Sequence, residues 1–340
     1  MNPSMPKHLP LILLLAACTA TQQAHPQSPT TLPGPQVRSL TGSVPSAPTK
    51  DEFSFLVGGH LYGNPGALSA VPAPTLLTQI HAIRNSPDQF IISTGDLIRS
   101  FSPTMIVPTM ELSRFLEKPI FNAPGNHDYV PGEYEKVFGP SFGSFQYGNA
   151  LFVLLNTERQ PWHFDDDQIE MVKSTADWVL RQPDIHHVFY FAHKVVFAVE
   201  EPRYASLLRN CNGRDGLNGT SNFGSAVLPT LRQVAAKKRV LWFGGDLGVP
   251  WSFSLFYDDH KDHGITYLGC GLGGTESDCM LRVRVAGKSL NIDPVPMHAG
   301  ATTMNGLRID KPVTHYGPDF WNQHFKKRAS ERLPTIDDRK

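Results

Sequence analysis

Three adjacent polar side chains in the first half of the chain, Asn126, His127 and Asp128, can carry chemistry. Asn126 offers a neutral oxygen ligand, His127 can hold a proton near neutral pH, and Asp128 can orient a neighbouring imidazole. The apolar run 118–121 before them predicts a short strand, which a Pro-Gly pair ends. Open α/β sheets place their chemistry at the carboxyl ends of strands, so we expect a functional site here.

Two further predicted strands also end in ligand-type side chains. Asp96 follows an apolar run that ends at residue 93, and His193 follows one that ends at residue 192. Together with Asn126, they supply the oxygen and imidazole donors that divalent metals accept in proteins. The repetition favours a metal site over an ordinary polar turn.

The order and spacing of these residues resemble the calcineurin-like metallophosphoesterases. The matching motifs are Gly95-Asp96, Gly125-Asn126-His127-Asp128 and His193, and the similarity runs from about residue 53 to about residue 293. The resemblance implies an α/β (α+β) fold, arranged as a four-layer αββα sandwich. It also implies two metal ions that share one aspartate and activate water for attack on phosphorus.

The resemblance assigns a role to each matching side chain. Asp96 is the bridging carboxylate, and Asn126 and His193 hold the second metal ion. His127, next to Asp128, protonates the leaving oxygen or stabilises the transition state. His60 is the histidine of the family's opening Asp-x-His motif.

The chain departs from the family pattern in two motifs. Gly58 replaces the aspartate of the opening motif, and Asp246 and Gly248 replace the histidines of the closing Gly-His-x-His. Both glycines remove ligands of the first ion, whereas Asp246 keeps an oxygen for the second. His60 and Asp96 alone are too few donors for the first ion, so we expect about one divalent ion (Mn, Fe, Mg or Zn) per chain. Its expected ligands are Asp96, Asn126, His193 and Asp246.

Two functions remain open at this point. The first is an exported phosphoesterase that hydrolyses a phosphate ester of a small molecule by metal-activated water. The second is a non-catalytic relative that binds a phosphorylated ligand or an envelope glycan. His127 favours the enzyme, since a binding protein has no evident need of a proton donor, whereas the missing ligands favour the binding protein. We favour the enzyme.

Alternating apolar runs and helical patterns predict the elements that position these residues. Strands are expected at 53–57, 90–94, 120–123, 147–155 (a hairpin), 188–192, 240–243, 253–257, 265–269, 281–285 and 289–292. Helices are expected at 74–85, 106–116, 168–181 and 228–238. The alternation predicts a layered α/β core in residues 51–296. The acidic triplet 165–167 is interpreted as a helix cap, with a metal site as the alternative.

The N-terminal residues resemble an export signal. A short apolar run leads to Leu15-Ala16-Ala17-Cys18, which resembles a bacterial lipobox whose cysteine carries the lipid. A plain signal peptide is the alternative. Residues 1–18 are therefore expected to be a lipoprotein-type signal peptide, and 19–50, rich in Pro, Ser, Thr and Gln, a flexible tether. The expected location is the bacterial cell envelope, with a lipid anchor in the outer membrane.

Composition limits the remaining possibilities. The chain has 340 residues, 40% of them hydrophobic, and a formal net charge of zero. It can hold one large catalytic domain, and its charge does not indicate a nucleic-acid partner.

Residues 297–340 are interpreted as a polar C-terminal extension. Cys270 and Cys279 are close enough in sequence to form a disulfide, and the turn 258–263 is interpreted as a solvated hairpin turn rather than a metal site.

Overall fold

The computed structural model describes residues 31–48, 51–64, 72–210, 219–248, 254–299 and 307–331. The predicted signal peptide, including Cys18, lies outside the described residues. None of the helices within these ranges combines the length and the apolar character needed to cross a membrane.

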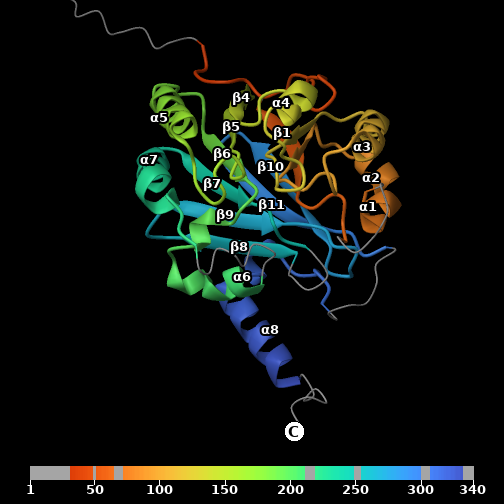
Figure 1. The fold of residues 1–340 in the computed structure, drawn as a ribbon. Helices are drawn as coiled ribbons and strands as arrows, with labels where there is room; N and C mark the ends of the chain where they lie inside the picture. The colour runs from red at the N-terminus through yellow and green to blue at the C-terminus, as the bar shows by residue number, and fades with distance from the viewer. Residues whose placement is uncertain are drawn as a thin grey trace, which may run out of the picture.

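Two mixed sheets form the centre of the molecule (Figure 1). The five-stranded sheet has the order β11-β10-β1-β2-β3, and the six-stranded sheet has the order β4-β5-β6-β7-β9-β8. The strands of the first sheet are β1 (Glu52–Gly58), β2 (Ile91–Ser93), β3 (Ile120–Asn122), β10 (Cys279–Ala286) and β11 (Ser289–Pro296). Those of the second are β4 (Gly143–Tyr147), β5 (Ala150–Leu154), β6 (His187–Ala192), β7 (Arg239–Gly244), β8 (Leu255–His260) and β9 (Ile265–Cys270).

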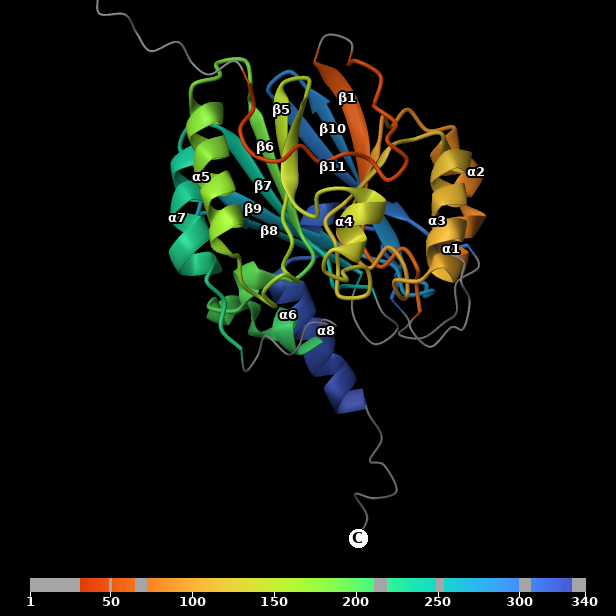
Figure 2. The ribbon, with the colours of Figure 1, turned by 45° about the horizontal axis from the view of Figure 1, so that its top comes forward.

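Helices lie outside both sheets (Figures 1 and 2). The first sheet is flanked by α1 (Pro74–Thr78), α2 (Ile80–Arg84), α3 (Pro103–Leu116) and α4 (Glu133–Phe138). The second sheet is flanked by α5 (Asp166–Leu180) and α7 (Leu228–Ala235), with α6 (Ala205–Asn210) and α8 (Pro318–Glu331) near β8. The predicted four-layer α/β sandwich is confirmed.

The apolar runs of the strands are explained by burial on both faces. In β1, Phe55 and Val57 enter the core between the two sheets, where Phe152 and Phe191 of the second sheet also lie. Leu56 points the other way and packs with the helices that cover the first sheet. Alternate side chains at positions 55–57 thus fill two apolar layers, which is why this part of the strand is an unbroken apolar run.

The predicted flexible tether is wrong for its described part, residues 31–48. Ser144 N in edge strand β4 donates to Pro35 O at 2.9 Å, and Leu40 N donates to Ile120 O in edge strand β3 at 2.8 Å. The segment therefore crosses an edge of each sheet (Figure 2). Covering exposed strand edges satisfies their backbone groups, an interaction that a composition rich in Pro and Ser does not reveal.

The C-terminal extension was also predicted incorrectly. Within its described part, Ile309, Val313, Tyr316 and Trp321 are buried in the core of the main domain. Tyr257 N in β8 donates to Tyr316 O at 3.1 Å, which ties this segment to the second sheet. A few spaced apolar side chains are enough to fasten a mostly polar segment.

Three local predictions have different outcomes. The helix expected over 74–85 is two helices that meet at Gln79. The cap is confirmed, because the Asp165 side chain accepts from Gln168 N at the start of α5. The predicted disulfide is wrong: Cys270 and Cys279 are free and buried. They lie in strands of different sheets, and their Sγ atoms contact the carbonyl oxygens of Val57 and Met280 respectively.

Candidate metal centre

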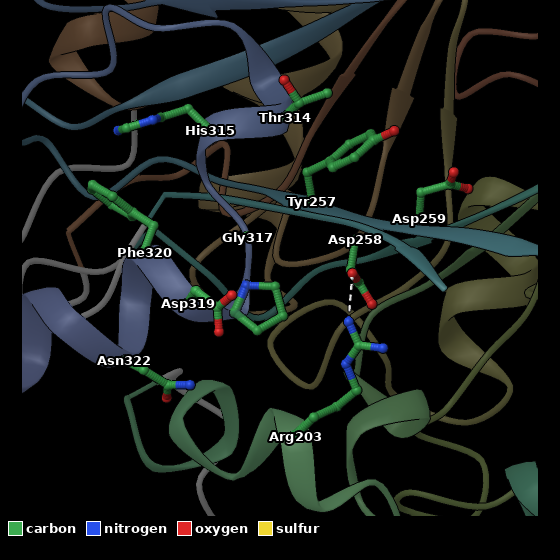
Figure 3. Close-up of a pocket in the computed structure, with 11 residues that line it drawn as sticks. Arg203, Tyr257, Asp258, Asp259, Thr314, His315, Gly317, Asp319, Phe320 and Asn322 are labelled. Carbon is green, nitrogen blue, oxygen red and sulfur yellow. Dashed lines mark hydrogen bonds and ion pairs between the residues drawn. The ribbon is translucent and has the colours of Figure 1, made fainter. Parts of the chain in front are cut away.

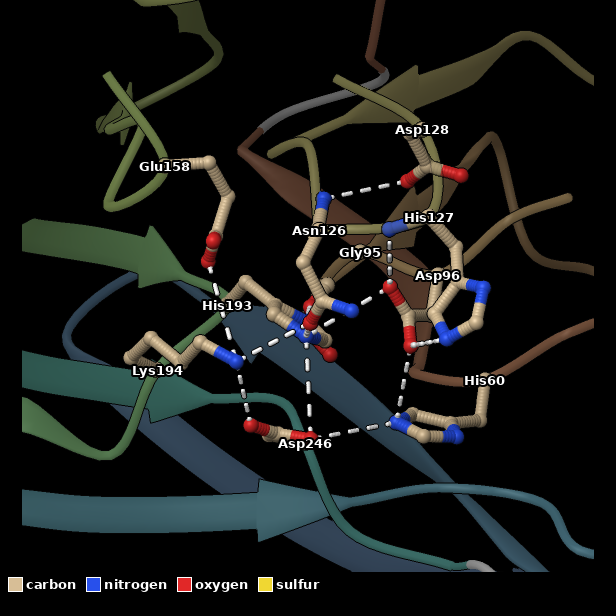
Figure 4. Close-up of polar contacts among 12 residues, drawn as sticks. His60, Gly95, Asp96, Asn126, His127, Asp128, Glu158, His193, Lys194 and Asp246 are labelled. Carbon is tan, nitrogen blue, oxygen red and sulfur yellow. Dashed lines mark hydrogen bonds and ion pairs between the residues drawn. The ribbon is translucent and has the colours of Figure 1, made fainter. Parts of the chain in front are cut away.

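Four strand ends converge on one point. His60 follows β1, Asp96 follows β2, His193 follows β6 and Asp246 follows β7. β1 runs parallel to β2 and β6 runs parallel to β7, so the carboxyl ends of each pair lie together, one pair from each sheet. One donor atom from each residue lies within 4.8 Å of the other three, and all four residues are fully buried. We call these four residues the metal cluster (Figure 4).

The histidine nitrogens and carboxylate oxygens of the metal cluster lie about as far apart as two ligands of one ion. His60 Nε2 lies 3.3 Å from Asp96 Oδ2 and 3.5 Å from Asp246 Oδ1. His193 Nε2 lies 3.5 Å from Asp96 Oδ1 and 3.8 Å from Asp246 Oδ1. Four ligands at about 2.1 Å from a central ion are about 3.4 Å apart. Two imidazoles and two carboxylates are donors that zinc, iron and manganese accept.

The tautomer of His193 also favours a cation at this point. Its Nδ1 lies 2.9 Å from Thr94 O, and a carbonyl can only accept, so Nδ1 carries the hydrogen. Burial lowers the pKa of His193 to about 3, which keeps the ring neutral. Nε2 is then a lone pair that faces Asn126 Oδ1 at 3.3 Å as well as the two carboxylates. A lone pair among oxygens is repelled by them, and a positive ion between them removes that repulsion.

Buried polar atoms of the cluster point to the same conclusion. Both ring nitrogens of His60 and Asp96 Oδ2 have no hydrogen-bond partner among the described residues. Leaving such an atom unsatisfied costs about 1–3 kcal/mol. Burial also raises the pKa of Asp96 to about 8, so without a cation beside it this carboxyl tends to hold a proton at neutral pH. The residues present therefore fit a divalent ion.

The backbone holds the ligands in a restricted conformation. His60, Asp96 and Asp246 have φ values of 50°, 54° and 60°, in the left-handed region that non-glycine residues rarely occupy. Neighbouring glycines allow the close approach: a Cβ on Gly245 would lie 2.0 Å from Thr94 O, and one on Gly95 would lie 2.4 Å from His193 Nδ1. Strain of this kind, about 1–3 kcal/mol per residue, is typical of functional sites.

The closing motif has no space for its missing histidine. Gly248 has a φ of +95°, and a Cβ there would lie 2.2 Å from the backbone carbon of Gly271. Gly58 is less confined, since its Cβ would meet the flexible end of Met280 at 3.0 Å. The backbone itself therefore excludes one ligand that the family pattern places in the first ion's site.

One predicted ligand is arranged differently from the sequence interpretation. His60 joins Asp96, His193 and Asp246 around one point, although it was assigned to a different ion. Asn126 Oδ1 lies 3.3 Å from His193 Nε2 and also accepts from Lys194 Nζ at 2.9 Å, so its role as a ligand stays a prediction.

His127 and Asp128 do not form a hydrogen-bonded pair; each makes its own contacts. His127 Nδ1 lies 2.6 Å from Arg99 O, so this carbonyl, and not Asp128, orients the ring. His127 Nε2 lies 3.9 Å from Asp96 Oδ2, and the side chain is 31% exposed. Asp128 is fully buried and accepts from the backbone N–H groups of Ile98 and Gly125 at 3.0 and 3.1 Å. Asp128 therefore holds the loop that carries His127.

Three polar residues near the metal cluster were missed from the sequence. Lys194 Nζ donates to Asp246 Oδ2 at 2.8 Å, and Glu158 Oε1 lies 4.0 Å from the same ammonium. Burial raises the pKa of Glu158 to about 7. The Tyr62 hydroxyl is buried without a hydrogen-bond partner in the described structure, and its ring lies 5.1 Å from that of His127. For Lys194 and Tyr62, the available signals were their positions directly after His193 and two residues after His60.

The turn 258–263 proved more ordered than predicted. Asp258 and His260 belong to strand β8 and are buried. Asp258 accepts from Arg203 at 2.8 Å beside a pocket of about 570 Å³ between β8 and the start of α8 (Figure 3). His260 lies near Glu201 and His263, and we call these three residues the hairpin cluster.

Comparisons with known proteins give similarity of structure only. No family model matches the chain, and no curated protein matches it. It is similar to a purple acid phosphatase from yellow lupin (Lupinus luteus) seeds, with 12% identity, a TM-score of 0.49 and coverage of 76% of this chain and 54% of that one. The chain thus spans about half the length of that phosphatase.

Two other solved structures are similar at the same level. GAP50, the anchor in the inner membrane complex of Plasmodium, is 14% identical with a TM-score of 0.46, over 84% of this chain and 96% of that one. The sulfate thiohydrolase SoxB of Thermus thermophilus is 8% identical with a TM-score of 0.42, over 85% and 63%. Such similarity assigns no activity, so the chemistry must come from the side chains.

Proposed function

We propose that this chain is a metal-dependent phosphoesterase that works with one divalent ion held by His60, Asp96, His193 and Asp246. The observation that supports this most strongly is the set of four fully buried residues whose donor atoms lie within 4.8 Å of one another, several of them without a hydrogen-bond partner among the described residues. A divalent ion there supplies Lewis-acid chemistry, which polarises a phosphoryl oxygen and makes water a stronger nucleophile.

The chain's own residues supply the proton transfer. The carbonyl of Arg99 holds His127 Nδ1, so the opposite nitrogen, Nε2, is directed toward Asp96. The partial exposure of this ring leaves it accessible to a bound ester. In its protonated form, His127 can give a proton to the leaving oxygen, a contribution typically of about 10²- to 10⁴-fold in rate. The buried carboxylate of Asp128 keeps the supporting loop in place.

The proposed setting follows from the N-terminal residues. Cys18 and the preceding apolar run support a lipid-anchored protein of the bacterial cell envelope. Its proposed substrate is a phosphoester, either a small molecule or a phosphorylated envelope glycan. Replacing Cys18 by Ser should release the protein from the membrane fraction, and unchanged fractionation would contradict the anchor.

A non-catalytic binding protein is the second candidate. The observation that favours it is the closed backbone at Gly248, which excludes a histidine ligand of a two-ion site. Such a protein would bind the ion and a phosphorylated ligand but hydrolyse nothing.

Metal analysis combined with an ester assay distinguishes the two. The full chain is loaded with Mn²⁺ or Zn²⁺, freed of excess ion, and tested on aryl phosphate mono- and diesters. The enzyme is expected to hydrolyse at least one class, to lose activity with a chelator and to regain it when the ion is restored. Bound metal without hydrolysis would support the binding protein, and no bound metal would overturn both.

A further inference from the structure

A lysine ammonium lies inside the candidate site, where a solvated side chain would be expected. Lys194 Nζ donates to Asp246 Oδ2 at 2.8 Å and to Asn126 Oδ1 at 2.9 Å (Figure 4). Glu158 Oε1 lies 4.0 Å away, and the Lys194 side chain is only 12% exposed. Two of these three oxygens belong to residues that the sequence interpretation assigned to a metal ion.

The surroundings of Lys194 hold it in this position. Its backbone N–H donates to Thr157 Oγ1 at 3.1 Å, and its ammonium lies 5.7 Å from the centre of the Trp162 ring. The backbone contact fixes the start of the side chain, and the ring covers its end. A buried lysine with two short contacts to oxygen is a fixed charge and not a mobile surface group.

Asp246 connects this ammonium to the metal cluster. Its Oδ1 faces His60 Nε2 and His193 Nε2 at 3.5 and 3.8 Å, whereas its Oδ2 faces Lys194. One carboxylate therefore lies between two positive positions, the proposed ion and the ammonium. This arrangement gives the site two adjacent cations while only one of them is a metal.

We propose that Lys194 is the built-in second cation of this metal centre: its ammonium occupies the oxygen-lined position beside Asp246, excludes a second divalent ion and provides positive charge for the phosphoryl group. This inference rests on the proposed metal site. A phosphate monoester carries up to two negative charges, and one divalent ion is already balanced by the carboxylates of Asp96 and Asp246. The ammonium supplies the additional positive charge that the substrate requires.

Removing the ammonium should open the position to a metal. Lys194→Met frees the oxygens of Asn126, Asp246 and Glu158, which are hard donors suited to Mn²⁺ or Mg²⁺. Bound manganese is measured by elemental analysis after loading and gel filtration. The unmodified chain is expected to hold about one equivalent and Lys194→Met about two. Lys194→Arg, which keeps the charge, is expected to stay at one.

A matched control separates this effect from the loss of any lysine whose ammonium is held by protein oxygens. Lys238 also has an ammonium held by protein oxygens, the carbonyls of Gln182 and Ile185 at 2.7 and 2.6 Å, but it lies outside the metal centre. Lys238→Met is expected to leave manganese binding at one equivalent. Two equivalents in this variant would show that the effect is not specific to Lys194.

The melting temperature provides a second readout in case Lys194→Met folds poorly. Without metal, this variant leaves Asp246 buried without its ammonium and should melt lower than the unmodified chain. Saturating Mn²⁺ should then raise its melting temperature more than it raises that of the unmodified chain. Lys194→Gln, which keeps a hydrogen-bond donor but no charge, should behave in the same way.

The outcomes distinguish the inference from the proposed function. If the unmodified chain binds one equivalent and both neutral variants also stay at one, with an unchanged response of the melting temperature to Mn²⁺, the role of Lys194 is overturned while the one-ion site stands. If the unmodified chain binds no ion, the proposed function itself fails.

Discussion

Two groups of histidines and carboxylates in this molecule look alike as lists of donors but differ as sites. In the metal cluster, His60, Asp96, His193 and Asp246 lie at four strand ends from both sheets and are fully buried. In the hairpin cluster, the two histidines lie at one end of a single hairpin, and the Glu201 side chain is 28% exposed.

The orientation of the rings separates the two clusters further. His260 and His263 are stacked with centroids 3.7 Å apart and an interplanar angle of 1°, so their in-plane lone pairs cannot point to a common centre without rotation. His263 Nδ1 is also engaged with the Tyr267 hydroxyl at 2.8 Å. In the metal cluster, by contrast, Thr94 O fixes His193 with its other nitrogen directed at the carboxylates.

The difference shows that the presence of ligand-type residues in the sequence identifies a metal site less reliably than the fixed positions of their donor atoms in the structure. A metal must recover the cost of its dehydration from donors that are already in place. Strand ends from two packed sheets provide such fixed positions, whereas a turn between two strands leaves its side chains free to form other contacts.

The largest expected effect comes from removing the central carboxylate. Asp96→Ala should abolish metal binding and lower kcat/KM for an aryl phosphate by at least about 10³-fold, because Asp96 faces both histidines of the cluster. Glu201→Ala, the matched change in the hairpin cluster, should leave both quantities unchanged. Metal content and initial rates are measured for both variants. Retention of the ion in Asp96→Ala would contradict the assignment of the metal site to the metal cluster.

A second change separates ion binding from proton transfer. His127→Ala should lower kcat by about 10²- to 10⁴-fold while the metal content stays the same, because its ring lies beside the cluster without being one of its four donors. Tyr62→Phe removes only a buried hydroxyl next to this ring and should have a smaller effect. Loss of metal in His127→Ala would place this residue among the ligands.

The lack of space for a side chain at Gly248 can be tested by measuring the free energy of unfolding. Gly248→Ala should lower the free energy of unfolding by about 3 kcal/mol or more, since a side chain there meets the backbone of Gly271 and the positive φ adds strain. Denaturant unfolding measures this, with Gly287→Ala as a control at a positive φ where an added Cβ meets no atom within 4 Å. Comparable losses in both variants would show that conformation alone, and not lack of space, excludes a histidine here.

The smallest expected effect lies in the hairpin cluster and depends on pH. Burial and the neighbouring His260 lower the pKa of His263 below its usual 6.5. The unfolded chain therefore takes up a proton at a higher pH than the folded protein does, so this stability is fully present above pH 6.5 and is lost as the pH falls below it.

His263→Gln should remove that dependence, a change of less than about 1 kcal/mol because the ring is partly exposed. Urea unfolding at about pH 5 and pH 8 measures it. The exposed His81→Gln should leave the dependence intact. If His263→Gln instead lowers the metal content, the hairpin cluster is a second ion site.

Much of the fold was predictable from sequence because it follows local patterns. Apolar runs that end in Gly, Pro or a polar side chain marked most of the strands, and the ends carrying Asp96, Asn126 and His193 pointed to the site. The grouping of His60 with the other three donors was not predictable in this way, since it depends on how two sheets pack against each other.

The errors have a common physical origin. Lysine is ordinarily a solvated residue, so the sequence contained no sign that Lys194 would be enclosed by Asp246 and Asn126. The segments before residue 51 and after residue 296 were judged by their polar composition. Their described parts are held by a few contacts, such as those of the buried Leu40 and Trp321, that average composition conceals.

Anomalous diffraction from crystals of the manganese- or zinc-loaded chain tests the central claim most directly. The predicted result is one strong peak per chain, with His60 Nε2, His193 Nε2 and oxygens of Asp96 and Asp246 at about 2.0–2.2 Å from it. The ammonium of Lys194 should lie on the far side of Asp246 from the ion. Two peaks in this site, or a peak only at Glu201, His260 and His263, would contradict the account.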